Sequence, residues 1–430
     1  MSLGTKIREL RLAKGLTQSE LGAGLVTPSM ISQIESDKAN PSYKVLEAIA
    51  EKLEEPLEYF LADIATQMEQ NNAFKVACTL IRSEMYDRAA TLLEQLLEEK
   101  LSSNLNEAEL RYQLGICCMN LGEMERATEL HIQASKMHES KFDYEGTIQA
   151  QIQLGIVYMK SKKPHKSIYE WRRALALFEN LLHTQPLLKA EVLMHLADVS
   201  NQMGEYQDSL MYYQEAYKAL NKTNKLKEIG LIYMEMGSSY AKTQEYEKAG
   251  EYAQHAIAIF DALNVIKLRV KINVQYAVML REQGNADESL QILEACLTTC
   301  NQQSLEEELC RIYGEIALHH YFKGDFDGAR NAVQHGFASQ AMDSLPLGHL
   351  YKTLGKIEVA CGNTTSALQN FEVAVKTYRE HSRHLDLAMT YQEIAALHEA
   401  TGEYQKATQY LNLMNAAYME NLRERGVLIT

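Results

Sequence analysis

A group of polar side chains between residues 17 and 38 has the types and the spacing to hydrogen bond to a ligand. Ser29 and Gln33 lie near one face of a helix predicted over residues 28–36, and each of them both donates and accepts hydrogen bonds. Such side chains can match the donor and acceptor pattern that a base pair presents in the major groove. If this segment binds DNA, the candidate contacts are Gln18, Thr27, Pro28, Ser29, Ser32, Gln33 and Lys38.

These residues divide into two roles. Ser29 and Gln33 are expected to read base edges, and Pro28 to touch a thymine methyl group. Gln18 opens a predicted helix, so its side chain and the positive helix end can meet a phosphate, and Lys38 can do the same just beyond residue 36. The alternative for Gln18 and Ser29 is that they only cap helices, and for Pro28 that it only starts one.

The charge of the chain is unevenly distributed. The 430 residues carry a formal net charge of -14, yet residues 1–44 hold six Lys or Arg against four Asp or Glu. A long acidic body is repelled by a polyanion, whereas a short basic segment is not. Any DNA-binding function is therefore expected in the first 44 residues.

Helix-start signals indicate several short helices in the same segment. Thr17 and Glu20 form a capping box, and Thr27 followed by Pro28 is an N-cap with proline at the first helical position. Further helices are predicted to open at Pro41-Ser42 and, briefly, at Pro56. We predict a five-helix domain over residues 1–62, with a core formed by Leu21, Leu25, Ile31, Ile34, Val45, Leu46, Ile49 and Leu53.

The string IRELRLAKGLTQSELGAGLVTPSMISQIESDKANPS closely resembles the Cro and phage-repressor (XRE) class of helix-turn-helix domains. The resemblance implies a lambda-repressor-like fold in which the helix over residues 28–36 enters the major groove. Because one such domain reads only a short half-site, we expect a homodimer or a higher homo-oligomer on double-stranded operator DNA.

From about residue 70 the chain repeats itself nine times, with a mean period of about 40 residues. Each copy has a small residue on its first helix, a turn position seven residues later, and a small residue on its second helix after five more. The turn positions are Glu84, Gly122, Lys162, Gly204, Gln244, Gly284, Gly324, Gly362 and Gly402. The second-helix small residues are Ala89, Ala127, Ser167, Ser209, Ala249, Ser289, Ala329, Ala367 and Ala407.

Small residues at helix crossings allow close packing, and a residue at the turn position leaves the first helix by a left-handed turn. The pattern resembles the tetratricopeptide repeat and covers residues 70–430, after a linker predicted at residues 63–69. The fold class is therefore all-α. Units of this kind stack into a right-handed superhelix whose concave wall is lined by the first helices.

A helix-turn-helix followed by nine such repeats resembles the RRNPP family of Gram-positive quorum-sensing regulators. Membership implies that a short signalling peptide binds in the concave groove and changes the oligomer, and so the spacing of the DNA-binding heads. Asn and charged residues on the groove face of the first helices have the side chains to bind such a peptide. The predicted peptide-binding residues are Asn120, Lys160, Asp198, Asn201, Ser238, Lys242 and Arg281. Each has an alternative as an ordinary solvated groove residue.

No motif in the sequence points to a cofactor, a metal or a catalytic site. Cys296, Cys300 and Cys310 lack the partners that complete a zinc site, and adjacent helical residues such as His319 and His320 point apart. The chain has neither a long apolar run nor an apolar leader, so we expect a cytoplasmic protein with no membrane partner.

The sequence is also compatible with two other functions. The repeats of the related Rap phosphatases act on response regulators, so the array here could bind such a protein and inhibit or dephosphorylate it. The activity of the Rap proteins resides in an N-terminal helical bundle, and here a helix-turn-helix occupies that end. The other alternative is a peptide-independent repressor that uses its repeats only to dimerise.

Overall fold

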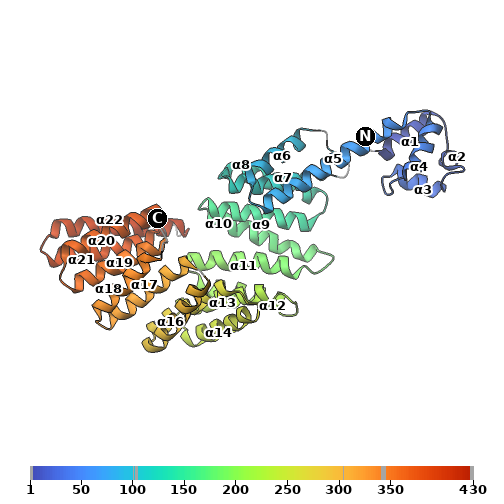
Figure 1. Ribbon diagram of the computed structural model, residues 1–430. Coiled ribbons are helices and arrows are strands. Elements are labelled where there is room, and N and C mark those ends of the chain that lie inside the picture. The colour runs from blue at the N-terminus through green and yellow to red at the C-terminus, as the bar shows by residue number, and fades with distance from the viewer. Residues whose placement is uncertain (1–2, 100, 102–104, 304, 340–344, 427–430) are drawn as a thin grey trace. The chain divides into compact units, whose positions relative to one another are not determined.

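The computed structural model describes residues 3–99, 101, 105–303, 305–339 and 345–426, and the described residues form helices without any strand (Figure 1). The chain divides into two compact units. One comprises residues 1–161 with 176–181, and the other comprises residues 162–175 with 182–430.

The N-terminal domain consists of four short helices and the start of a long one: α1 (Leu3–Ala13), α2 (Gln18–Gly22), α3 (Pro28–Glu35), α4 (Tyr43–Leu53) and α5 (Leu57–Arg82). Both predicted caps are present, since Thr17 and Glu20 form the capping box of α2 and Thr27 caps α3. Of the predicted core residues, Leu25 and Val45 are half-buried and the other six are buried: Leu21, Ile31, Ile34, Leu46, Ile49 and Leu53.

Helix α5 differs from the short fifth helix that the sequence predicts. It begins directly after Pro56, as expected, but continues for 26 residues as far as Arg82. Residues 63–69, predicted as a linker, are therefore helical. The domain limits at residues 62 and 70 stay predictions.

Beyond the N-terminal domain, the helices follow one another in the order that nine two-helix repeats predict, and the first two are α5 and α6 (Tyr86–Glu98). The next pairs are α7 (Glu107–Asn120) with α8 (Met124–Ser140), α9 (Tyr144–Lys160) with α10 (Pro164–Leu177), and α11 (Pro186–Met203) with α12 (Tyr206–Leu220). A short 3-10 helix, η1 (Phe178–Asn180), follows α10. The remaining pairs are α13 (Leu226–Lys242) with α14 (Tyr246–Ala262), α15 (Ile266–Glu282) with α16 (Ala286–Gln303), α17 (Glu306–Phe322) with α18 (Phe326–Ala338), α19 (Leu345–Ala360) with α20 (Thr364–Glu380), and α21 (His384–Ala400) with α22 (Tyr404–Glu424).

The geometry of each pair confirms the predicted repeat register. All nine turn positions have positive φ, from +58° to +89°, and six of them are glycine. All nine small residues of the second helix are at most 6% exposed. In the eight repeats whose two helices lie in one unit, these helices are in contact, as close packing at a small residue predicts. Within the second unit, first helices also contact the next first helix, as α13 contacts α15 and α15 contacts α17.

The end of the chain contacts the beginning of the second unit. The Arg425 guanidinium donates to the carbonyls of Gln202 (2.9 Å) and Met203 (2.8 Å), at the end of α11. Glu424 pairs with Lys162, at the turn before α10. These contacts join residues that are more than 200 positions apart in the sequence.

Candidate nucleic-acid interface and repeat-domain pocket

Helix α3 presents one apolar face to the domain core and one polar face to solvent. Ile31 and Ile34 are buried at 0% and 2% exposure and anchor the helix. The Thr27 hydroxyl accepts a hydrogen bond from the Met30 amide at 3.3 Å, which fixes the first turn. Ser29 and Gln33 lie on the exposed face, as the sequence predicts.

A buried ion pair holds α3 against α1. The Arg11 guanidinium donates to both carboxylate oxygens of Glu35, at 2.5 and 3.1 Å, and to the Leu16 carbonyl at 2.7 Å. The side chains of Arg11 and Glu35 are only 9% and 4% exposed. Burial alone would raise the pKa of the Glu35 carboxyl, but hydrogen bonds from Arg11 and Gln18 outweigh it and lower that pKa.

Six of the seven predicted DNA contacts are exposed: Thr27, Pro28, Ser29, Ser32, Gln33 and Lys38. The exception is Gln18, which is half-buried and whose amide donates to Glu35 at 2.8 Å. A phosphate contact by Gln18 stays a prediction, and it has to be compatible with this internal bond. The Arg11–Glu35 pair was not predicted. The only indication of it in the sequence is that each of the two helices has a charged residue on its apolar face.

Lys52 on α4 fixes the other end of the helix-turn-helix. Its ammonium donates to the carbonyls of Glu20, Leu21 and Ala23, at 3.3, 3.2 and 2.6 Å. These carbonyls lie at the C-terminal end of α2, where a cation is favourable. The turn between α2 and α3 is therefore held on both sides.

A pocket of about 350 Å³ opens between the first helices of three consecutive repeats in the second unit. Its walls come from α13, α15 and α17, and α14 contributes Ala249 and Ala253 to its floor. Met234 and Met279 make part of the surface apolar, while Gln275 is one of the polar lining residues. Such a combination of an apolar surface with a few polar groups is typical of a ligand site.

The structure brings together only some of the predicted peptide-binding residues. Ser238 and Lys242 line the pocket, and Arg281 pairs at 2.7 Å with Glu315, which also lines it. Asn201 accepts a hydrogen bond from Lys242 at 2.9 Å. Reasoning from the sequence missed Met234, Gln275, Glu282 and Arg311, although Glu282 occupies the same repeat position as Lys242.

Asp198, Asn120 and Lys160 do not line this pocket. The Asp198 carboxylate accepts a hydrogen bond from the Tyr213 hydroxyl. Asn120 donates to the Ile116 carbonyl of its own helix at 2.9 Å, and Lys160 is exposed at the end of α9. Both Asn120 and Lys160 belong to the first unit, and their peptide-binding role stays a prediction.

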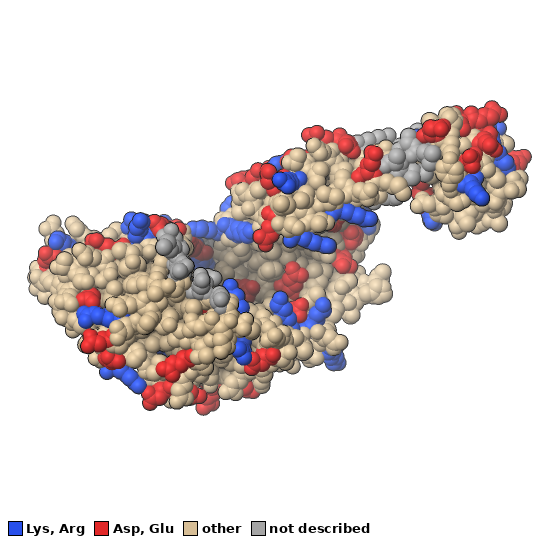
Figure 2. Space-filling model, viewed as in Figure 1, with Lys and Arg blue, Asp and Glu red and all other residues tan. Residues whose placement is uncertain are grey.

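Partial burial shifts the ionisation of groups near the pocket. Burial raises the pKa values of Asp198 and Glu235, and the charge of Asp198 raises that of Glu235 further. Burial also lowers the pKa of Lys242. Each shift favours the neutral form, so an oppositely charged ligand group would restore the charged form. On the face of the repeats shown in Figure 2, acidic and basic side chains are interspersed.

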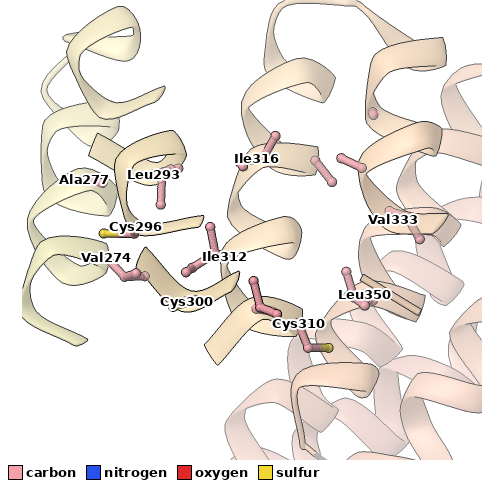
Figure 3. Close-up of a cluster of buried hydrophobic side chains, with 14 of the residues drawn as sticks. Val274, Ala277, Leu293, Cys296, Cys300, Cys310, Ile312, Ile316, Val333 and Leu350 are labelled. Carbon is pink, nitrogen blue, oxygen red and sulfur yellow. The ribbon is translucent and has the colours of Figure 1, made fainter. Parts of the chain in front are cut away.

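The cysteines that the sequence places close together are core residues. Cys296, Cys300 and Cys310 lie in one apolar cluster with Ile312 and Leu350 (Figure 3). Burial raises the pKa of each of the three thiols to about 11, so they are protonated at neutral pH. Among the described residues, no group of three or more His, Cys, Asp or Glu could hold a metal ion. No described helix combines the length and the apolar character needed to cross a bilayer.

Comparison with protein families identifies both parts of the chain. A helix-turn-helix family matches residues 7–60, and tetratricopeptide-repeat families match residues 146–222 and 231–261. A curated relative, Protein KINESIN LIGHT CHAIN-RELATED 2 from Arabidopsis thaliana, is 23% identical over 228 residues, which are 51% of this chain and 34% of that protein. The chain thus spans about a third of the curated relatives that it matches.

Solved structures with a similar fold include aspartyl phosphate phosphatase F from Bacillus subtilis. It is 14% identical, with a TM-score of 0.58, over 84% of this chain and 96% of that one. PlcR from Bacillus thuringiensis, in complex with the peptide PapR7 and DNA, is 21% identical over 63% of this chain and 98% of its own, with a TM-score of 0.40. The apo quorum sensor NprR from B. thuringiensis is 11% identical over 73% and 99%, with a TM-score of 0.45.

PlcR and NprR are the RRNPP regulators to which the sequence resemblance points, NprR by length and repeat number and PlcR as a shorter relative. The predicted architecture, a helix-turn-helix of the XRE type joined to tetratricopeptide repeats, is confirmed.

Proposed function

Since this chain joins an XRE-type helix-turn-helix to tetratricopeptide repeats, we propose that it is a cytoplasmic transcriptional regulator. It binds operator DNA through α3 as a homodimer or a higher homo-oligomer. A short signalling peptide binds among the first helices of its repeats and changes the oligomer. It acts by binding and not as an enzyme.

The observation that carries the DNA-binding proposal is the exposure of Ser29 and Gln33 on a helix that is fixed from three sides. The Thr27 cap, the Arg11–Glu35 pair and the buried Ile31 and Ile34 hold α3 in place without using its outer face. A preorganised polar helix face of this kind loses little entropy when it enters the major groove.

The pocket supports the peptide part of the proposal. It lies among first helices, where the repeat pattern predicts ligand binding, and it has both apolar and hydrogen-bonding walls. For a peptide to act as a switch, it must bind one arrangement of the repeats more tightly than the other.

A DNA-binding experiment tests the assignment of α3. A duplex selected from a random pool by the wild-type protein is compared with an unselected duplex, using fluorescence anisotropy at several salt concentrations. We expect S29A and Q33A each to lose about 1–3 kcal/mol of preference for the selected duplex. K38A should instead weaken binding to both duplexes and reduce the salt slope by about 1.

K222A is the matched control, because it removes an exposed lysine from the repeats and leaves the helix-turn-helix unchanged. Wild-type preference in both S29A and Q33A would exclude α3 as the element that reads the sequence.

The second candidate function is action on a response regulator, which the fold likeness to aspartyl phosphate phosphatase F brings into consideration. A phosphotransfer assay with a purified response regulator separates the two functions. Accelerated loss of the aspartyl phosphate from the response regulator would favour the second candidate. An unchanged lifetime of that phosphate would favour the function as a transcriptional regulator.

A further inference from the structure

One position on the second helix is occupied by a large side chain in most of the repeats. This knob position lies four residues after the small residue of the second helix. Its occupants are Leu93, His131, Trp171, Tyr213, Ala253, Leu293, Val333, Phe371 and Leu411. Eight of the nine repeats therefore have a large residue there, and the fifth repeat has alanine.

The large knobs are central to the packing of their repeats. Seven of the eight large knobs are at most 2% exposed: Leu93, His131, Trp171, Tyr213, Leu293, Val333 and Phe371. Leu411 belongs to the last repeat and is 42% exposed. Figure 3 shows two buried examples, with Leu293 beside Ala277 and Val333 near Leu350. His131 and Phe371 lie against Gly115 and Gly355 on the first helix of their own repeats, and the Trp171 ring stacks on His195 of the next repeat.

In the fifth repeat, Ala253 leaves the knob position without a large side chain, and Ala253 lines the pocket of about 350 Å³. The part of the pocket beside Ala253 is called the gap below. Ala249 and Gly237, which also lack a bulky side chain, line the same pocket. Water in the pocket makes weaker contacts with its apolar walls than a packed apolar side chain would. An apolar ligand side chain that enters the gap makes the stronger contacts.

We propose that this gap is an anchor site for one large apolar side chain of the ligand, which takes the place of the missing knob. This inference rests on the proposed function, in which a short peptide binds the repeats. Ser238 and Gln275 line the same pocket and offer a donor and an acceptor each to the peptide amides beside the anchor. The expected ligand is thus a peptide with one large apolar residue such as leucine or phenylalanine. The backbone amides on either side of that residue must be free to hydrogen bond to Ser238 and Gln275.

Filling the gap from the protein side tests the inference. A253L restores the knob that Leu93 and Leu293 supply in their repeats, and A253V copies Val333 in case leucine does not fit. A258L is the matched control, because it makes the same change at an exposed position of the same helix. The probes are four random heptapeptide pools with a fixed central Leu, Phe, Ala or Asp, and the peptides retained by each full-length protein are measured by mass spectrometry.

We expect wild type and A258L to retain peptides from the Leu and Phe pools about 10- to 100-fold more than from the Ala and Asp pools. A253L should lose this preference and melt at a higher temperature than unliganded wild type. If A253L fails to fold by circular dichroism, A253V gives the same comparison. Equal retention of the same peptides by wild type and a folded gap-filled variant would overturn the anchor and leave peptide recognition intact. If wild type retained no peptide from any pool, the proposed function would fail and the anchor with it.

Discussion

Glu35 is a carboxylate in the interior of a small helical domain, where an unpaired charge would be unstable. It is tolerated because Arg11 supplies two hydrogen bonds and Gln18 supplies a third. Removing one member of such a buried pair leaves an uncompensated charge and costs about 3–5 kcal/mol. The pair therefore positions α3 without touching any ligand.

The lowered pKa of Glu35 makes the stability of this domain depend on pH. The ionised form is favoured in the folded state, so its contribution is present above the ordinary pKa near 4.5 and is lost as the pH falls through the folded value. We expect the free energy of opening of α3, measured by native-state hydrogen exchange, to fall on acidification in wild type. E35Q should be less stable at neutral pH and should lack this part of the acid dependence.

E54Q serves as the control, because Glu54 pairs with Lys14 at 2.8 Å but its side chain is 83% exposed. An exposed pair contributes little, so E54Q should behave as wild type. The same acid dependence in E35Q and wild type would show that Glu35 does not tie α3 to its domain.

At the scale of single residues, the sequence predicts best what local rules control. The capping residues Thr17 and Thr27 and the exposure of Ser29 follow from spacing alone. The Arg11–Glu35 pair joins residues 24 positions apart, and no local pattern links them. The pocket residues were partly missed for the same reason, because three separate helices bring them together.

Among the structural elements, the turn between the helices of each repeat is the most regular. Gly284 has φ of +89° and no atom within 4 Å of where a Cβ would lie. Gln244 occupies the equivalent position of the preceding repeat with φ of +63°. A side chain in this region costs about 1–2 kcal/mol, which exceeds the entropy cost of glycine, about 0.5–1 kcal/mol.

Exchanging the two residues should change stability in opposite directions. We expect Q244G to stabilise the protein by up to about 1 kcal/mol and G284Q to destabilise it by a similar amount. Differential scanning calorimetry of the full chain measures both effects as shifts of the melting temperature. If Q244G lowered the melting temperature, the Gln244 side chain would have to make a stabilising contact that outweighs its backbone strain.

Helix α5 shows why element boundaries are harder to predict than element types. Pro56 marks its start correctly, but between Leu57 and Arg82 the sequence contains neither glycine nor proline to end it. The linker predicted at residues 63–69 lies within this helix. The repeat boundaries were predicted better because each turn position recurs in nine copies.

For the molecule as a whole, the charge distribution suits a regulator with one DNA-binding end. The basic residues of the first 44 positions belong to a domain that can approach DNA, while the rest of the chain carries a net charge of -16. Two such ends on one oligomer would bind two half-sites, so the oligomeric state determines affinity for the operator.

Light scattering should show whether the ligand changes the oligomer. We expect a mass of at least twice 48.8 kDa for the DNA-binding form, and a change of mass when peptides retained by the wild-type protein are added. A253L should keep its mass when the same peptides are added. Constant mass together with full operator affinity without peptide would favour a peptide-independent repressor.

In most repeat arrays each unit touches only its neighbours, so the last repeat can fray independently of the first. Here Arg425 joins the final turn of the chain to Gln202 and Met203, which lie at the end of α11. Helices α11 and α22 of the second unit are thus joined by hydrogen bonds as well as through the repeats between them. Separating the last repeat from the array therefore also requires breaking its contact with α11.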